Sequence, residues 1–386
     1  MLRSLVGSEM CIRDRAVAMA WTPMARHTWI DVVVMVPFMT PPFAAAMAWM
    51  DVTRLGGIAT QLGGKAVGQL AHNVIYSVWG MALIMACELF PFLYLLLRNA
   101  CATVPASAIE SARVVGATWG EIVGRILVPI LIGPYSLGAL IVFIRAAGEF
   151  GTPVTLGNAI GFPVLVSSIH QNITVDPISF SRAAASSSVL FGLGVTVWAI
   201  QQYVSRKDIS GGGRVARPVR LTPSLMARCA MWLHMIAVFL LSVIIPYISI
   251  VLGAMTILRS QPPTLTNLTF DYFAIALGKS SAQEALLNSA FLGFLGATVA
   301  IIVATAVALT AHRARRNLPA RVNDFLAVAP DTVPGIVMAV GFILLWNAPW
   351  LPLTPYGTRW ILVLGYTVMF RVPEDEDPAC AVGSQW

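Results

Sequence analysis

Charged residues are scarce in this sequence. Only 11% of its 386 residues are Asp, Glu, Lys or Arg, whereas 57% are hydrophobic. Soluble globular domains carry about 25% charged residues, so this chain has too little polar surface to face water on every side. The scarcity excludes a soluble enzyme and a disordered chain, and the long apolar runs exclude a β-barrel, whose segments alternate over about ten residues. The composition predicts an all-α, polytopic transmembrane helical bundle.

Cysteine and histidine are also rare. The cysteines are Cys11, Cys87, Cys101, Cys229 and Cys380, and no two of them have CxxC spacing. Neither a disulfide framework nor a metal site is therefore indicated. His72 and His170 have no acid or cysteine partner at ligand spacing, so we expect no metal and no cofactor. The net charge of +7 is interpreted as cytoplasmic loop charge rather than as a surface for nucleic acid.

The two ends of the chain differ in character from the rest. Residues 4–15, SLVGSEMCIRDR, lack the apolar core of a signal peptide and resemble a translated sequencing-library adapter. We therefore expect residues 1–15 to be foreign to the fold. The tail 372–386 places four consecutive acids directly after an apolar run, which is typical of a frameshift or contig end, although a genuine acidic cap is an alternative. A fragment truncated at both ends is expected.

Long apolar runs recur along the chain, and a helix needs about 20 mostly apolar residues to cross a membrane. The segments that meet this requirement are 28–50, 73–97, 128–147, 183–204, 229–257, 289–311 and 323–346, with a shorter one at 358–371. Arg and Lys concentrate in alternate loops, namely 98–127, 205–228 and 312–322. Because positively charged loops stay in the cytoplasm, these three loops are predicted to lie inside.

A short pattern of Asp and Pro occurs twice. Asp31-x5-Pro37-x3-Pro41 recurs as Asp324-x5-Pro330-x3-Pro334. The recurrence predicts two tandem repeats, residues 16–204 and 229–371, joined by the basic, Gly- and Pro-containing linker 205–228. Two unrelated proline-kinked helices are the alternative, since proline is common in membrane helices.

The loop 98–127 and the residues just after it carry the most specific motif. Glu110, Ser111, Ala112, Gly116, Ile126 and Pro129 follow the pattern E-A-A-x3-G-x9-I-x-L-P, with Ser111 in place of the first Ala and Val128 in place of Leu. This resembles the EAA loop of binding-protein-dependent ABC importer permeases. The resemblance implies a transport subunit without covalent chemistry of its own. It also implies a cytosolic ABC ATPase dimer that contacts Glu110 and Gly116, and a periplasmic or extracellular solute-binding protein.

The residues of this loop predict a short helix that starts at Pro105, a residue suited to a first helical turn. Ala108, Ile109, Ala112 and Val115 form one apolar stripe on that helix, and Gly116 allows the chain to turn. An exposed apolar stripe indicates docking of a helix into a partner's groove. An amphipathic helix lying on the membrane is the alternative.

A second resemblance narrows the family. The run 148–157, GEFGTPVTLG, and the loop 161–180 resemble ferric-iron-type permeases with two permease halves fused in one chain. In that sub-family each half has six crossings, so the first half here would lack two crossings and the second would stop before its own EAA loop. Uptake of ferric iron is expected. The alternatives are phosphonate, polyamine or another small polar solute, or a secondary transporter driven by an ion gradient.

A few polar residues stand inside or beside the crossings. Glu88 lies in the middle of its crossing, where a buried acid is a functional candidate by default, although a hydrogen-bonded carboxyl is an equal alternative. Arg145 and Glu149, at the outer end of the third crossing, could line a translocation path or pair with each other. Two sequences that suggest nucleotide binding, Gly278-Lys279-Ser280 and 210–213, lack the surrounding motif and are rejected.

Overall fold

The computed structural model describes residues 28–207, 225–259, 261, 263–313, 333–352 and 354–369. Several expectations fall outside these residues: the foreign segment 1–15, most of the linker 205–228, the tail 372–386, and the second copy of the Asp-Pro pattern except Pro334. The adapter resemblance, the truncation and the repeat therefore stay predictions.

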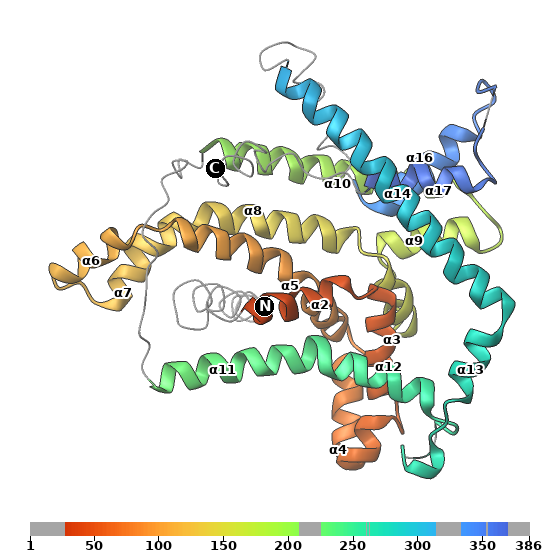
Figure 1. Ribbon diagram of the computed structural model, residues 1–386, viewed down its shortest axis with the longest axis horizontal. Helices are drawn as coiled ribbons and strands as arrows, with labels where there is room; N and C mark the ends of the chain where they lie inside the picture. The colour runs from red at the N-terminus through yellow and green to blue at the C-terminus, as the bar shows by residue number, and fades with distance from the viewer. Residues whose placement is uncertain are drawn as a thin grey trace. The chain divides into compact units, whose positions relative to one another are not determined.

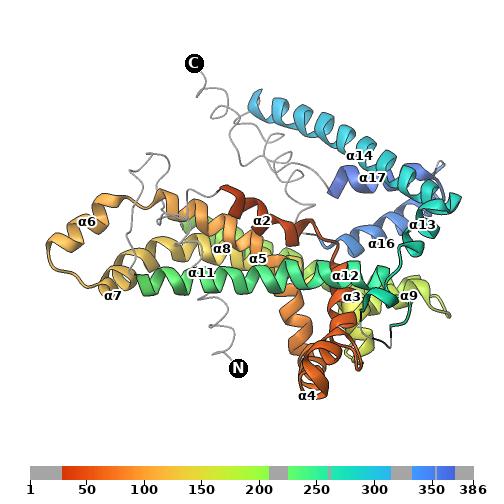
Figure 2. The same cartoon turned by 60° about the horizontal axis from the view of Figure 1, so that its bottom comes forward.

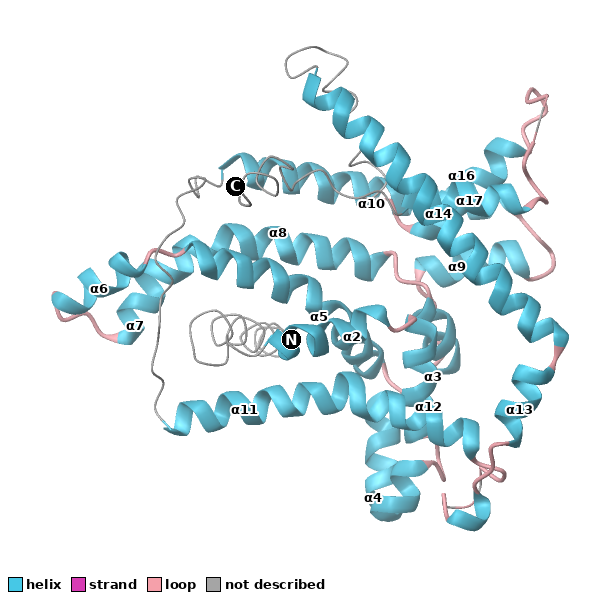
Figure 3. Ribbon diagram, in the orientation of Figure 1, coloured by secondary structure: helices cyan, strands magenta, loops and turns pink. Residues whose placement is uncertain are grey.

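The part of the chain that is described is helical, with no strand beyond one isolated bridge between Thr256 and Leu268 (Figure 3). The all-α prediction is confirmed. The elements in chain order are α2 (Thr28–Met39), α3 (Pro42–Thr53), α4 (Ile58–Ile75), α5 (Val78–Thr103), α6 (Ala106–Val114), α7 (Trp119–Ile122), η2 (Val123–Leu127), α8 (Val128–Ala147), η3 (Pro153–Gly157), α9 (Leu165–Thr174), α10 (Phe180–Lys207), α11 (Leu225–Phe239), η4 (Leu240–Ile244), α12 (Ile245–Met255), η5 (Leu265–Asn267), α13 (Asp271–Gly278), α14 (Ser280–Arg313), α16 (Gly335–Trp346) and α17 (Arg359–Met369).

The chain divides into two compact units. Unit 1 comprises Met1–Val164 and Thr196–Thr269, and unit 2 comprises Leu165–Val195 and Phe270–Trp386. In unit 1, α11 and α12 pack with α2, α3 and α5 through the junction η4. In unit 2, α14 packs against α17. The units do not coincide with the repeats predicted from sequence, because the first helices after the linker pack with the first half of the chain.

Helices long and apolar enough to cross a membrane occupy most of the predicted crossings. They are Val78–Cys101, Gly120–Ala147, Phe180–Val204, Arg228–Met255 and Ser280–Ala306. Their outward side chains are apolar: Ile301 and Ile302 on α14 are 59% and 63% exposed. Such faces suit lipid, in which a helix satisfies its own backbone hydrogen bonds. The polytopic helical prediction is confirmed, with α16 and α17 as shorter apolar helices at the two last predicted crossings.

The first predicted crossing, 28–50, is wrong as a single helix. It consists of α2 and α3, which meet at a bend of 92°. The reason lies in two consecutive prolines. Pro41 precedes Pro42 and adopts φ −58° and ψ 128°, as expected when a following proline ring excludes the helical conformation. Pro37, by contrast, lies inside α2 without ending it.

The segment 51–72, which joins the first two predicted crossings, also contains a helix. α4 spans most of that segment, with one interruption at Gly64, whose φ of +82° is a left-handed conformation. Ser77 then caps α5, accepting a hydrogen bond from the Gly80 N–H at 3.1 Å. The predicted crossing 73–97 accordingly begins at Val78.

Candidate functional site

The loop that carries the EAA-like motif joins the ends of two packed helices. Figures 1 and 2 show α5 and α8 side by side, with α6 and α7 at one end of the pair and α3 and α4 near the other. Pro105 is the residue just before α6, with ψ 127°, and no side chain caps that helix. The helix therefore begins one residue after the predicted start.

Gly116 ends α6 in the way that its position in the motif predicts. Its φ is +87°, and nothing lies within 4 Å of the place where a Cβ would stand. The Gly116 N–H donates to Arg113 O at 3.0 Å, and the Ala117 N–H donates to Ala112 O at 3.0 Å. These two bonds form a Schellman motif, which favours glycine in the left-handed position.

The start of α7 depends on a motif that the sequence analysis missed. The Thr118 backbone N–H and hydroxyl both donate to Glu121 Oε2 at 2.9 Å, and the Glu121 N–H donates to Thr118 Oγ1 at 3.4 Å. This is a capping box, and its signal was available as T-x-x-E before an apolar run. The two caps set the direction in which the chain leaves α6 and enters α7.

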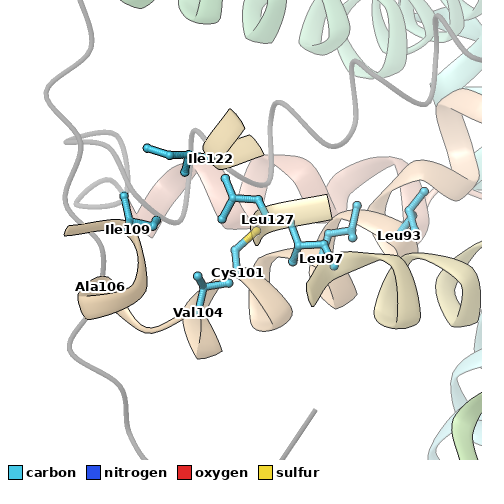
Figure 4. Packing of buried hydrophobic residues seen from close by; sticks show 9 residues of the cluster. Leu93, Leu97, Cys101, Val104, Ala106, Ile109, Ile122 and Leu127 are labelled. Atoms are coloured by element: carbon cyan, nitrogen blue, oxygen red, sulfur yellow. The ribbon is translucent and has the colours of Figure 1, made fainter. Parts of the chain in front are cut away.

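The inward face of α6 packs on the ends of α5 and α8. Ile109 is 3% exposed and Ala112 packs against the same cluster, which Figure 4 shows gathered around Cys101. The cluster consists of Leu93, Leu97, Cys101, Val104, Ala106, Ile109, Ile122, Leu127 and Leu131. Ile109 is therefore not exposed as the apolar stripe implied, because its side chain holds α6 to its own membrane helices. Ala112 is half-buried, and its docking role stays a prediction.

The outward face of α6 carries different residues. Glu110 and Ser111 are exposed, and Val114 and Val115 are each 87% exposed. Gly116 is exposed beside them. Of the motif residues farther along, Ile126 lies in η2, half-buried, and Pro129 is the second residue of α8, exposed. The surface available to another protein therefore combines one acid, one hydroxyl and two valines.

The candidates for a translocation path lie away from this loop. Glu88 on α5 and Glu149 after α8 are both buried, 7% and 9% exposed. The Thr152 N–H donates to Glu149 Oε1 at 3.1 Å. The Arg145 guanidinium lies 5.6 Å from the centre of the Phe92 ring. The packing of η3 on α5 places Glu149, just before η3, along the helix that carries Glu88. The role of all three residues stays a prediction.

A pocket of about 560 Å³ lies between α3 and α12, lined by residues including Met47, Asp51, Arg54, Tyr76 and Arg259. Asp51 Oδ1 is 3.0 Å from Arg54 Nε and 3.6 Å from Arg259 Nη1. Burial raises the pKa of the Tyr76 phenol. Arg54 is only three residues from Asp51, whereas Arg259 is distant along the chain, so the sequence alone does not predict that both arginines meet this acid.

The comparisons decide the family. Residues 17–210 match the family described as binding-protein-dependent transport system inner membrane component. The chain belongs to this family. It is accordingly a multi-pass protein of the bacterial cytoplasmic membrane, as the apolar helices and the EAA-like loop predicted. The family match covers the loop with α6 and α7 and the break between α2 and α3.

Several curated proteins are similar to the chain. A ferric transport system permease protein, FbpB, of Actinobacillus pleuropneumoniae is 23% identical over 94% of this chain and 52% of its own length. FbpB 1 of Haemophilus influenzae, also named for ferric transport, is 24% identical over 96% of this chain and 58% of its own length. The sulfate transport system permease protein CysT of Escherichia coli is 23% identical over 42% of this chain. The chain spans about half the length of the ferric relatives. No solved structure matches it.

Proposed function

We propose that this chain is the membrane-spanning permease subunit of an ATP-driven ABC importer for ferric iron. It moves the solute, and a separate pair of cytosolic ATPase subunits hydrolyses ATP. A periplasmic or extracellular solute-binding protein delivers the solute to the outer face. The family description, which names a binding-protein-dependent transport system, supports the delivery step.

The observation that carries this function is the construction of the loop between α5 and α8. Ile109 anchors α6 to the buried cluster, and the helix ends at Gly116. The exposed side chains of Glu110, Val114 and Val115 therefore have a fixed position relative to α5 and α8. Two exposed valines on a short, anchored helix suit a shallow apolar groove. Movement of the ATPase subunits would pass through α6 directly to the ends of α5 and α8, because the three share one core.

We assign ferric iron as the solute from the share of the chain that each group of relatives matches. Relatives named for ferric transport match nearly the whole chain, whereas the one named for sulfate matches less than half of it. Phosphonate, polyamine and other small polar solutes remain the alternatives, and an ion-coupled secondary transporter is a further one. Uptake of radioactive iron by cells expressing the complete transporter, compared with radioactive sulfate, phosphonate and polyamine, distinguishes them.

The docking role is tested by a matched pair of glycine substitutions. Gly116→Ala and Gly120→Ala each place a methyl group in open space, but only Gly116 has a left-handed backbone. That conformation costs an alanine about 1 kcal/mol, so Gly116→Ala should loosen the turn between α6 and α7. We expect reduced co-purification of the ATPase and reduced iron uptake for Gly116→Ala, and parent-like values for Gly120→Ala.

A charge reversal tests the exposed face without touching the turn. Glu110→Lys should weaken ATPase binding, because it reverses a charge on the exposed face of α6. The side chain lies outside the buried cluster, so the substitution does not disturb the packing of α6. Glu284→Lys, an exposed acid on α14, is the control and should leave binding unchanged. Full uptake and full ATPase binding in both Gly116→Ala and Glu110→Lys would show that this loop is not the docking element.

A further inference from the structure

Two buried acids lie in unit 1, and one of them, Glu88, has unsatisfied oxygens. The side chains of Glu88 and Glu149 are both more than nine-tenths buried, and Glu149 lies just before η3, which packs on the helix that carries Glu88. Neither oxygen of Glu88 has a hydrogen-bond partner within the described structure. An acid in this state inside a membrane helix is costly and marks an ion or solute pathway in most cases.

Helix packing places the two acids at the same height along α5. Gly138 on α8 lies against Leu93 and Leu96 of α5. Farther along, Leu156 in η3 joins a cluster with Ile84 of α5. The chain from α8 to η3 therefore runs along α5 toward its N-terminal end, and it passes Glu88 between these two contacts. Glu149 lies within that stretch.

Thr152 lies in the turn formed by residues 149–152 and could supply a third ligand oxygen. Thr152 is 0% exposed, and its N–H donates to both Glu149 oxygens, at 3.1 and 3.2 Å. Its buried hydroxyl lies beside the Glu149 carboxyl, and within the described structure Oγ1 makes no hydrogen bond of standard geometry. A buried hydroxyl that lacks a well-aligned hydrogen bond is unfavourable, so the turn presents a further oxygen ligand beside the Glu149 carboxyl.

This turn lies at the break between α2 and α3. A Cβ on Gly151 would stand 2.4 Å from the Phe43 backbone N, so the two backbones are in direct contact there. Interrupted helices inside membrane transporters line ion and substrate sites, because freed backbone groups are tolerated only beside a cavity or a ligand.

We propose that Glu88, Glu149 and Thr152 form a transient binding site for a hard, multiply charged metal cation on its way through the membrane. Carboxylate and hydroxyl oxygens are the ligands that hard cations prefer, and a cation would remove the repulsion between two adjacent carboxylates. The site rests on the proposed function as an iron importer, and it assigns the cation, rather than an anionic solute, to this position.

Terbium(III) is a suitable probe, since it is a hard trivalent cation with luminescence that reports binding. The chain in lipid nanodiscs should bind it, and the luminescence lifetime should show few bound waters because the site is buried. Glu88→Gln and Glu149→Gln should each weaken terbium binding by about tenfold or more, since each removes one ligand charge. Thr152→Val should weaken it less.

Glu284→Gln is the matched control, because it makes the same chemical change at an exposed acid on α14. It should bind terbium as the parent chain does. Parent-like affinity in both Glu88→Gln and Glu149→Gln, or an equal loss in Glu284→Gln, would overturn the cation site. Thermal unfolding of each variant verifies that the fold is retained.

A second measurement needs no variant. A hydrophobic carbodiimide reacts with carboxyl groups in apolar surroundings, and mass spectrometry locates the modified residue. We expect modification at Glu88 or Glu149 that terbium slows by about tenfold or more, since the bound cation would occupy both carboxylates. Modification at an unchanged rate in the presence of terbium would show that the two acids merely share a proton, and the site would then be rejected.

The proposed iron importer and the proposed cation site can be refuted independently of each other. Terbium binding is measured on the chain alone, without ATPase or binding protein, so it does not depend on uptake. If the complete transporter imports sulfate instead of iron, the proposed solute is wrong whatever the terbium result. If it imports iron and both glutamine variants import it as fast as the parent while binding terbium equally, iron transport stands and the site is wrong.

Discussion

At the scale of single residues, local hydrogen bonds fix the conformation of the loop between α5 and α8. Thr118→Ala removes the hydroxyl that takes part in two hydrogen bonds with Glu121. Loss of such a cap costs about 1 kcal/mol, so the amides of α7 should exchange hydrogen about fivefold faster. Thr118→Ser keeps the hydroxyl and should restore protection. Equal protection in Thr118→Ala and the parent would contradict the cap.

A second residue-scale prediction concerns Gly151. An added Cβ would stand 2.4 Å from the Phe43 backbone N, and this backbone cannot move aside as a flexible side chain could. Gly151→Ala should destabilise the protein by about 1–3 kcal/mol through overpacking. Gly293→Ala, at an α14 position with nothing within 4 Å, should be neutral or stabilising. Thermal unfolding in detergent compares them, and an unchanged midpoint for Gly151→Ala would refute the close approach.

At the scale of elements, α12 is tied to the first part of the chain by polar contacts. The Ser249 hydroxyl donates to Ala48 O at 2.9 Å in a buried position, and the Thr40 and Tyr247 hydroxyls lie 2.8 Å apart. These bonds cross between α12 and the α2–α3 pair. They bring the segment after the linker against the helix break near the acid pair.

Substitution of Ser249 tests this inter-helix tie. Ser249→Ala should lower stability by about 1 kcal/mol, since it leaves the buried Ala48 carbonyl without this donor. Ser136→Ala is the control, because its hydroxyl donates only within α8, to Ile132 O. Unfolding midpoints of the two variants should differ by a few degrees. Identical midpoints would show that the contact between α3 and α12 is apolar packing alone.

At the scale of the whole molecule, the charge of the loops predicts which side faces the cytoplasm. Val114 on α6 and Leu62 on α4 are 87% and 76% exposed and lie in loops of predicted opposite sides. In a chain whose native cysteines are replaced by Ser, Val114→Cys should react with a membrane-impermeant maleimide only in inside-out vesicles. Leu62→Cys should react only in right-side-out vesicles. The reverse labelling would invert the assigned orientation.

Much of this protein could be predicted from the sequence. Scarce charge and long apolar runs determine a helical membrane bundle, because lipid leaves the backbone no other partner than itself. The spacing from Glu110 to Pro129 predicted the shape of the loop between α5 and α8, since a turn that needs a left-handed residue favours glycine at one position. These features are local, so a linear pattern is enough to specify them.

Only the tertiary structure decided which faces of these elements meet. The sequence pattern placed Ile109 on an exposed stripe, yet its side chain is buried in the cluster around Cys101 at the ends of α5 and α8. Glu88 and Glu149 are far apart along the chain, and the packing of α8 and η3 on α5 places them along the same helix, whereas Thr152 meets Glu149 through a local turn. The 92° bend also depended on context, because Pro37 is tolerated within a helix while the Pro41–Pro42 pair ends one. Contacts between distant segments depend on helix register, which no local pattern contains.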